Sequence, residues 1–238
     1  MTIEARTGRK ATIASRLTET LREEVLSGRL EPGAKINLDR LREAMGVSAS
    51  PLREAMGRLV AEGLVESEDQ RGYRVVSASL AQLREVIDLR IAFTILALRH
   101  CVNEGTLDWE SDLMAALYRL TRSEIDPARP DSLAAWEIAH RNFHHALIAD
   151  CRRPMLLSLC TRLQMLHDRY RRMAPPVAGD PDLAADHRAI AEAAVARDAE
   201  TAVALLRDHF ARNGARLTAY LAERLPETAT TFAETRHI

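Results

Sequence analysis

The chain has 238 residues, more than the roughly 100–150 residues of a common single domain, so we expect two domains. Its apolar share of 47% and charged share of 28% are typical of a globular protein and exclude a disordered chain. The formal net charge of −1 excludes a globally basic nucleic-acid-binding protein, so any contact with DNA must come from locally placed basic residues.

The first part of the chain predicts three helices. Residues 1–10 are polar and are expected to form a mobile tail. Apolar residues then recur at helical spacing over 11–27, over 38–45 and over 51–62. A glycine follows each segment as a stop signal, and a serine, Ser48 or Ser50, can cap the third helix.

A change in periodicity follows these helices. Short strands are predicted at 64–66 and 73–76, and they flank the charged loop 67–72 as a β-hairpin, or wing. From Ser79 onward the sequence shows only helical periodicity. The first helix of this part is expected to run from Ser79 to about Gly105, and the others cover 108–124, 131–151, 154–173, 182–197 and 199–224.

These elements predict a mainly α chain with an N-terminal winged helix-turn-helix and a C-terminal all-α antiparallel helical bundle. The expected boundaries are a tail at 1–10, the winged helix-turn-helix at 11–78, the bundle at 79–226 and a C-terminal tail at 227–238.

The segment 38–59 has the helix, glycine turn, helix layout of a helix-turn-helix. In that motif the first residues of the second helix touch bases, which makes Ser48, Ser50 and Arg53 candidate DNA contacts. Further candidates in the preceding helix, the second helix and the wing are Arg40, Arg58, Arg71, Gly72 and Tyr73. The alternative is that these arginines form a solvated face, because residues 9–74 hold 12 Lys or Arg against 11 Asp or Glu.

The runs 46–65 (GVSASPLREAMGRLVAEGLV) and 71–75 (RGYRV) closely resemble the signature of the GntR family of winged-helix regulators. That resemblance implies binding to operator DNA. The family usually has Arg at the position of Ala49 and tends to have Arg at that of Gly57, so the operator sequence does not carry over.

Four histidines form a candidate metal site. His140 and His144 stand four apart on one predicted helix and share a face, while His187 and His209 lie on two later helices. A helical bundle can bring all four inward. Imidazole suits zinc, nickel, copper or iron, so the set predicts a divalent transition metal, with zinc the first choice. The alternative is a set of ordinary surface or core histidines. His145 is assigned to a neighbouring face, and no matching partners are seen for His100, His167 and His237.

Residues 80–222 resemble the all-helical effector-binding (FCD) domain of the FadR-type branch of GntR regulators. The stretches that carry the resemblance are 86–90 (VIDLR), 143–147 (FHHAL), 186–190 (DHRAI) and 197–209. The resemblance implies a divalent metal held by three His and an Asp or Asn, and this chain has His140 at the Asp or Asn position. The run from Trp136 to His144 also resembles a sub-branch that governs carbon-starvation and dicarboxylate-catabolism genes. With a fourth His we expect a softer metal preference and stronger acid sensitivity, because protonated His cannot ligate.

Arg90 is the first candidate for effector binding. In similar proteins an Arg there faces the cavity and can grip a carboxylate with two hydrogen bonds. The family often has Glu four residues later, but this chain has Thr94, which leaves Arg90 without that ion pair. The alternative is an Arg with a packed stem and a solvated head. Arg169 and Asn213 are further pocket candidates.

We therefore expect a transcription regulator, by the family's habits a repressor, and not an enzyme. As a homodimer it would bind palindromic double-stranded operator DNA, under control of a small organic acid, a dicarboxylate or hydroxy acid, at the metal. One alternative is a metal-responsive regulator without an organic effector. Another is a hydrolase with a His-held metal, which the absence of HExxH disfavours. Three cysteines without CxxC spacing, and no run of roughly 18 apolar residues, place the chain in the cytoplasm without a membrane partner.

Overall fold

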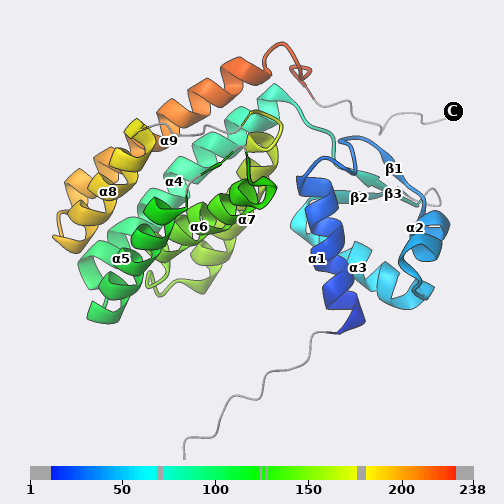
Figure 1. Ribbon diagram of the computed structural model, residues 1–238, viewed down its shortest axis with the longest axis horizontal. Helices are drawn as coiled ribbons and strands as arrows, with labels where there is room; N and C mark the ends of the chain where they lie inside the picture. The colour runs from blue at the N-terminus through cyan, green and yellow to red at the C-terminus, as the bar shows by residue number, and fades with distance from the viewer. Residues whose placement is uncertain (1–11, 69–71, 124, 127, 176–180, 229–238) are drawn as a thin grey trace, which may run out of the picture. The chain divides into compact units, whose positions relative to one another are not determined.

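The computed structural model describes residues 12–68, 72–123, 125–126, 128–175 and 181–228. The chain divides into two compact units, Met1–Ser77 and Ala78–Ile238 (Figure 1). The described residues form nine helices and a small three-stranded sheet. This confirms the predicted fold class, which is mainly α with a winged helix-turn-helix.

The first unit contains the helix-turn-helix and its wing. Its elements are α1 (Ile13–Leu26), β1 (Lys35–Ile36), α2 (Leu38–Met45), α3 (Ala49–Glu62), β2 (Val65–Glu68) and β3 (Gly72–Val75). The sheet is antiparallel with the order β1-β3-β2. The strand β1 was not predicted, because two residues are too few to show alternation.

The core of this unit lies between α1 and α3. Leu21 of α1 and the apolar face of α3, formed by Leu52, Met56 and Leu59, are fully buried. Gly46 ends α2 in the left-handed conformation, at φ 63°, which lets the chain turn sharply into α3. The turn therefore leaves the start of α3 on the surface, as a helix-turn-helix requires.

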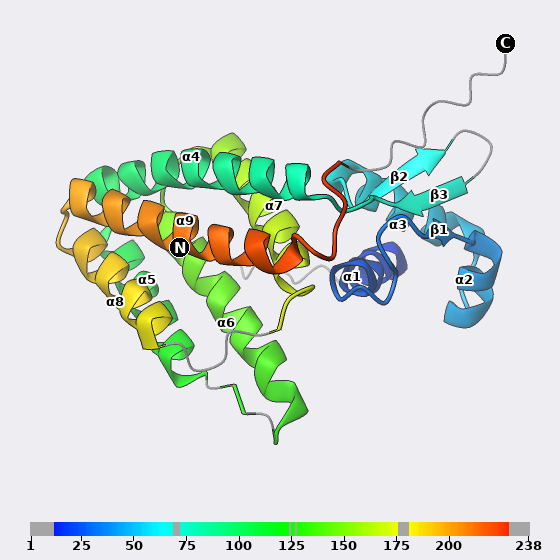
Figure 2. The same cartoon turned by 90° about the horizontal axis from the view of Figure 1, so that it is seen from above.

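The second unit is a helical bundle. Its helices are α4 (Leu80–Glu104), α5 (Leu107–Arg122), α6 (Pro130–Ile148), α7 (Pro154–Arg171), α8 (Pro181–Val195) and α9 (Ala199–Leu221). All six predicted helices are present, within a few residues of their expected ends. The long α4 packs against α9 and α7, while α8 packs against α9 and α5 against α6 (Figure 2). Among the described helices, none is both long and apolar enough to cross a lipid bilayer.

The start of α4 is bound by two distant segments. Ser79 caps the helix: its side-chain oxygen accepts a hydrogen bond from the Gln82 N–H. The backbone N–H of Ala81 donates to the Glu227 carbonyl at 2.9 Å. From α7, the Tyr170 hydroxyl accepts from the Ser79 N–H at 3.3 Å. The chain therefore still contacts the bundle at Glu227, where the sequence predicted a free tail.

Candidate metal centre and DNA-binding surface

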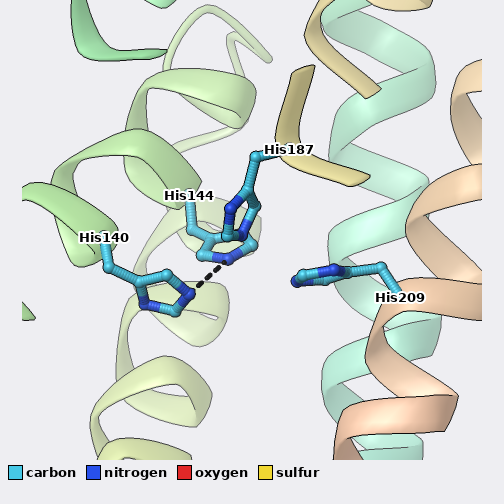
Figure 3. A group of neighbouring side chains, drawn as sticks. All are labelled: His140, His144, His187 and His209. Atoms are coloured by element: carbon cyan, nitrogen blue, oxygen red, sulfur yellow. Dashed lines mark hydrogen bonds between the residues drawn. The ribbon is translucent and has the colours of Figure 1, made fainter. Parts of the chain in front are cut away.

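The bundle brings the four predicted histidines together. His140 and His144 come from α6, His187 from α8 and His209 from α9, and their rings point toward one another (Figure 3). One ring nitrogen of each lies within 4.8 Å of those of the others. All four side chains are buried, at 2–6% exposure. Three helices, α6 and the consecutive pair α8 and α9, therefore build one compact cluster of nitrogen donors.

Aromatic packing orients the rings on the α6 side of the cluster. Trp136, one turn before His140, stacks on its ring at a centroid distance of 4.7 Å. Phe143 packs edge-on against both His144 and His187. The Nε2 atoms of His140 and His144 stand 3.2 Å apart. The aromatic neighbours thus hold the His140, His144 and His187 rings edge-on to one another in a buried site.

Burial is the main electrostatic influence on the cluster. It lowers the pKa of His140, His144 and His187 well below the usual 6.5, and the neighbouring histidines and Arg90 lower it further. The pKa of His209 falls to about 4 through burial, against the opposing effect of Asp186. The rings are therefore neutral at neutral pH, which is the form that binds a metal.

The contacts of His209 extend beyond the cluster. Its Nδ1 lies 3.1 Å from Oδ2 of Asp186, which precedes His187 on α8. Both oxygens of Asp186 accept from Nη2 of Arg212, at 2.8 and 2.7 Å. The predicted pocket residue Asn213 lies beside the cluster and donates to the His209 carbonyl at 2.8 Å. With Nδ1 engaged in this way, His209 presents Nε2 to the other histidines.

The donor set fits a transition metal. Tetrahedral zinc with bonds of about 2.0–2.1 Å to nitrogen spaces its ligands about 3.3 Å apart, close to the 3.2 Å between His140 and His144. The other donor pairs, which lie within 4.8 Å of one another, need to close by about 1.5 Å at most. Nε2 of His187 is buried without a hydrogen-bond partner among the described residues. Such an atom costs about 1–3 kcal/mol, which a metal bond would recover.

Arg90 lies on α4 close to the cluster, and its guanidinium is buried at 4% exposure. Its Nε and Nη2 both donate to Oε1 of Gln164 on α7, at 3.1 and 2.6 Å. Its Cζ stands 3.7 Å above the ring of Phe210. Burial lowers its pKa to about 10, so the group stays charged at neutral pH. The alternative of an Arg90 with a solvated head is therefore wrong. Where related proteins often have a Glu at the position of Thr94, the Arg90 guanidinium here binds the neutral amide of Gln164.

A polar network continues from Arg90 along α7. Gln164 donates to Asp168 at 3.0 Å, and Asp168 accepts from Arg171 at 3.4 Å. Arg171 also donates to Glu137 at 3.1 Å. Arg172 lies 2.8 Å from the same carboxylate. Among the described residues, the network therefore links Arg90, Arg171 and Arg172 with the carboxylates of Asp168 and Glu137 in a largely buried region.

Sequence reasoning missed three polar residues near the cluster: Asp186, Gln164 and His167. His167 is buried on α7, and its Nδ1 has no hydrogen-bond partner among the described residues. Burial lowers its pKa, and Arg90, Arg171 and His209 add to this. The spacing of Gln164, His167, Asp168 and Arg171 along α7 marks one helical face, and this signal was available in the sequence.

Arg169, a predicted pocket residue, lies about 100° around α7 from Asp168. It is fully buried, and its charge acts on the neighbouring Tyr170, whose hydroxyl meets the start of α4. The described contacts of Arg169 therefore lie near the start of α4, whereas Asn213 contacts His209 of the cluster.

The predicted DNA contacts lie mainly on the surface of the first unit. Ser48, Ser50, Arg53, Arg40 and Arg58 are exposed. Ser48 is the N-cap of α3, but its hydroxyl makes no capping hydrogen bond and stays available.

Arg58 is exposed but already engaged, because it donates to Ser15 at 3.0 Å and to Glu54 at 2.7 Å. Gly72 and Tyr73 are half-buried on β3. Arg71 lies outside the described residues.

Comparisons with known proteins match both units. Residues 13–75 match the model of bacterial regulatory proteins of the gntR family, and residues 85–212 match the FCD domain. The chain is 34% identical over 197 residues to the HTH-type transcriptional regulator BphR of Paraburkholderia xenovorans, covering 80% of this chain and 79% of that protein. It is 32% identical over 194 residues to the HTH-type transcriptional repressor GlaR of Escherichia coli, covering 79% and 88%.

Solved structures agree on the fold. McbR/YncC of E. coli superposes with a TM-score of 0.70 at 21% identity, covering 88% of this chain and 98% of that one. Regulators of this family bind operator DNA, and FCD domains bind small-molecule effectors and, in some members, metal ions. The relatives are regulators and not enzymes, which favours the predicted regulator over the hydrolase.

Proposed function

We propose that this chain, which belongs to the gntR family of bacterial regulatory proteins and carries an FCD domain, is a metal-dependent, acid-responsive transcriptional repressor. A small organic acid that binds at the histidine cluster would lower its affinity for operator DNA. The observation that carries this proposal is the cluster of four buried, neutral histidines close to a charged Arg90.

The resident group is a divalent transition metal, with zinc the first choice. Among the described residues no carboxylate belongs to the cluster, so the donors are four nitrogens. Imidazole prefers zinc, nickel or copper over magnesium or calcium. His140, His144, His187 and His209 would hold the ion, which would offer positive charge to an acid and would accept its carboxylate by expanding beyond four ligands.

The effector is a small carboxylate, a dicarboxylate or hydroxy acid. Arg90 presents two donors, Nε and Nη2, that match a carboxylate edge, and among the described residues both meet the single amide oxygen of Gln164. A carboxylate would bind Arg90 more strongly than an amide does, because both partners are then charged.

The acid and metal roles can be separated at Arg90. Arg90→Gln should weaken acid binding by about tenfold or more, since a charge-assisted hydrogen bond contributes about 1.5–3 kcal/mol. It should leave the bound metal in place, because Arg90 is not a ligand. Calorimetric titration of the metal-loaded variant checks both. Unchanged acid affinity would remove Arg90 from the effector site.

The repressor would act as a homodimer in the cytoplasm. Two recognition helices placed one DNA turn apart read a palindrome and combine their affinities. The helical unit would supply the contact between copies. On α4, Leu89 and Leu96 lie two turns apart on one face and are 37% and 46% exposed, which supports an apolar interface there. The leading residues of α3, Ser48, Ser50 and Arg53, would read each half-site.

The direct test uses the DNA upstream of the protein's own gene. Metal-loaded protein should retard this DNA, and one of a panel of C4–C6 dicarboxylates and hydroxy acids should release it. The same acid, at a concentration far above its dissociation constant, should raise the free energy of unfolding of the metal-loaded protein by several kcal/mol, which a thermal-shift assay detects.

Two results would overturn the proposal. Release by added metal alone, with no response to any acid, would indicate a metal-responsive regulator. Failure to retard DNA, together with turnover of simple esters or phosphates, would indicate the hydrolase.

A further inference from the structure

We infer that Asp186 is a positioning residue for the metal centre: it holds His209 in the tautomer that carries its proton on Nδ1 and offers Nε2 to the metal. The inference rests on the proposed metal site and adds a residue outside its ligand set. It concerns how one ligand is oriented, and it makes no use of the effector.

The geometry places the carboxylate behind the ligand. Oδ2 of Asp186 lies 3.1 Å from Nδ1 of His209, while the tip of the His209 ring points toward the other three histidines (Figure 3). The amide Nδ2 of Asn213 also lies 3.4 Å from Nδ1, but it donates to the His209 carbonyl at the shorter distance of 2.8 Å. The Asp186 carboxylate then accepts the Nδ1 proton, which leaves Nε2 without one. Such a contact fixes the ring and makes the ligating nitrogen more basic.

Two adjacent residues of α8 contribute to the metal centre in different ways. Asp186 and His187 are adjacent, so their side chains leave the helix about 100° apart. His187 enters the cluster, while Asp186 reaches α9 and contacts His209. One turn of α8 therefore provides one ligand and orients another.

His209 differs in this respect from the other ligands. Nδ1 of His144 is buried without a hydrogen-bond partner among the described residues. The rings on the α6 side are oriented by Trp136 and Phe143 through packing. His209 has a polar partner at its remote nitrogen, and hydrogen bonding to a carboxylate sets its tautomer in a way that packing cannot.

Arg212 keeps Asp186 in this supporting position. It lies one turn from His209 on α9 and donates to both oxygens of Asp186, at 2.8 and 2.7 Å. The pair holds the carboxylate at the rim, where its side chain is 21% exposed. Asp186 is thereby kept from turning into the cluster as a fifth donor.

The experiment measures zinc affinity by competition with a chelator in the full-length protein. Asp186→Asn keeps the shape but removes the charge, and it should raise the zinc dissociation constant by about 10–100-fold. Asp186→Glu should restore the affinity to within about threefold of wild type, because a carboxylate again faces Nδ1. The matched control is Asp208→Asn, which removes the same charge from an exposed residue beside His209 and should change affinity by less than about threefold.

A second measurement needs no variant. In zinc-loaded wild type, nitrogen NMR of the histidine rings should show His209 bound through Nε2, with a protected proton on Nδ1. Binding through Nδ1 would overturn the inference, even if Asp186→Asn fails to fold.

The outcomes separate the two claims. Wild-type protein that binds no zinc would overturn the proposed metal centre and this inference with it. Wild type that binds zinc while Asp186→Asn binds equally well would overturn the positioning role alone. An equal loss in Asp186→Asn and Asp208→Asn would assign the effect to long-range charge and also overturn it.

Discussion

The two units place their candidate functional groups in opposite environments. In the first unit, Ser48, Ser50 and Arg53 stand on the surface at the start of α3. In the second unit, the four histidines and Arg90 are buried within the bundle. Surface residues can bind a large partner such as DNA directly, whereas buried polar groups can serve only something small enough to enter.

The difference also concerns stability. An exposed arginine is solvated in the free protein, so it contributes little to folding. Buried polar atoms without partners, such as Nε2 of His187, oppose folding by about 1–3 kcal/mol each. We therefore expect changes in the second unit to alter both metal content and stability, and changes at the start of α3 to alter only DNA binding.

The largest expected effect is the loss of metal from His144→Ala or His187→Ala. Each variant loses one of four ligands. A loss of roughly a quarter of a binding free energy of about 10–16 kcal/mol raises the zinc dissociation constant by about 70-fold or more. Bound zinc after dialysis against a chelator, measured by atomic absorption, should therefore fall to near zero. His145→Ala is the matched control, because His145 is the exposed neighbour of His144 on α6 and should keep full zinc. Stoichiometric metal in either cluster variant would refute the ligand assignment.

The next effect is on the stability of the metal-free protein against pH. Burial lowers the pKa of five histidines in the folded state, namely His140, His144, His167, His187 and His209. Below about pH 6.5 the unfolded chain binds protons that the folded chain excludes, so stability is full above that pH and falls as the pH drops below it. The free energy of unfolding, measured with urea between pH 8 and pH 5.5, should fall with a slope that corresponds to the uptake of more than one proton on unfolding. A flat profile would mean that these rings are not buried and neutral.

A smaller effect is expected on the surface of the first unit. Arg53→Ala should weaken operator binding by about 1–3 kcal/mol if Arg53 contacts a base, with metal content unchanged. Arg58→Ala should cost less, because that guanidinium is already engaged by Ser15 and Glu54. Fluorescence anisotropy with labelled operator measures both. A larger loss of operator affinity in Arg58→Ala than in Arg53→Ala would contradict the assignment of the start of α3 as the part that contacts the bases.

The smallest effect is expected at Arg40, on the exposed face of α2. If it contacts a phosphate, Arg40→Ala should weaken binding to all DNA sequences alike. The slope of log affinity against log salt should then fall by about one. An unchanged slope would show that Arg40 makes no phosphate contact.

The two units also differ in how far sequence predicted them. The helix-turn-helix is a local motif, so Gly46 and the apolar face of α3 specified its geometry within a short segment. The four histidines could be predicted as a set, because their spacing and the family resemblance both pointed to a metal.

Contacts between distant helices could not be predicted in the same way. The pairing of Asp186 with His209 depends on how α8 rotates against α9, and that of Gln164 with Arg90 on how α7 packs against α4. Neither rotation is encoded in a local pattern. For that reason the sequence predicted only that Arg90 has no ion pair with residue 94, which is Thr94. It did not predict the hydrogen bonds that Arg90 donates to Gln164 of α7.

The central claim is that an acid acts on DNA binding through the metal. It is tested most directly by measuring operator affinity with metal-loaded and metal-free protein, each with and without the acid that stabilises the metal-loaded form. We predict that the acid weakens operator binding of the metal-loaded protein by tenfold or more, which is about 1.4 kcal/mol of coupling, and leaves the metal-free protein within about twofold. An equal effect of the acid on both forms would contradict the account.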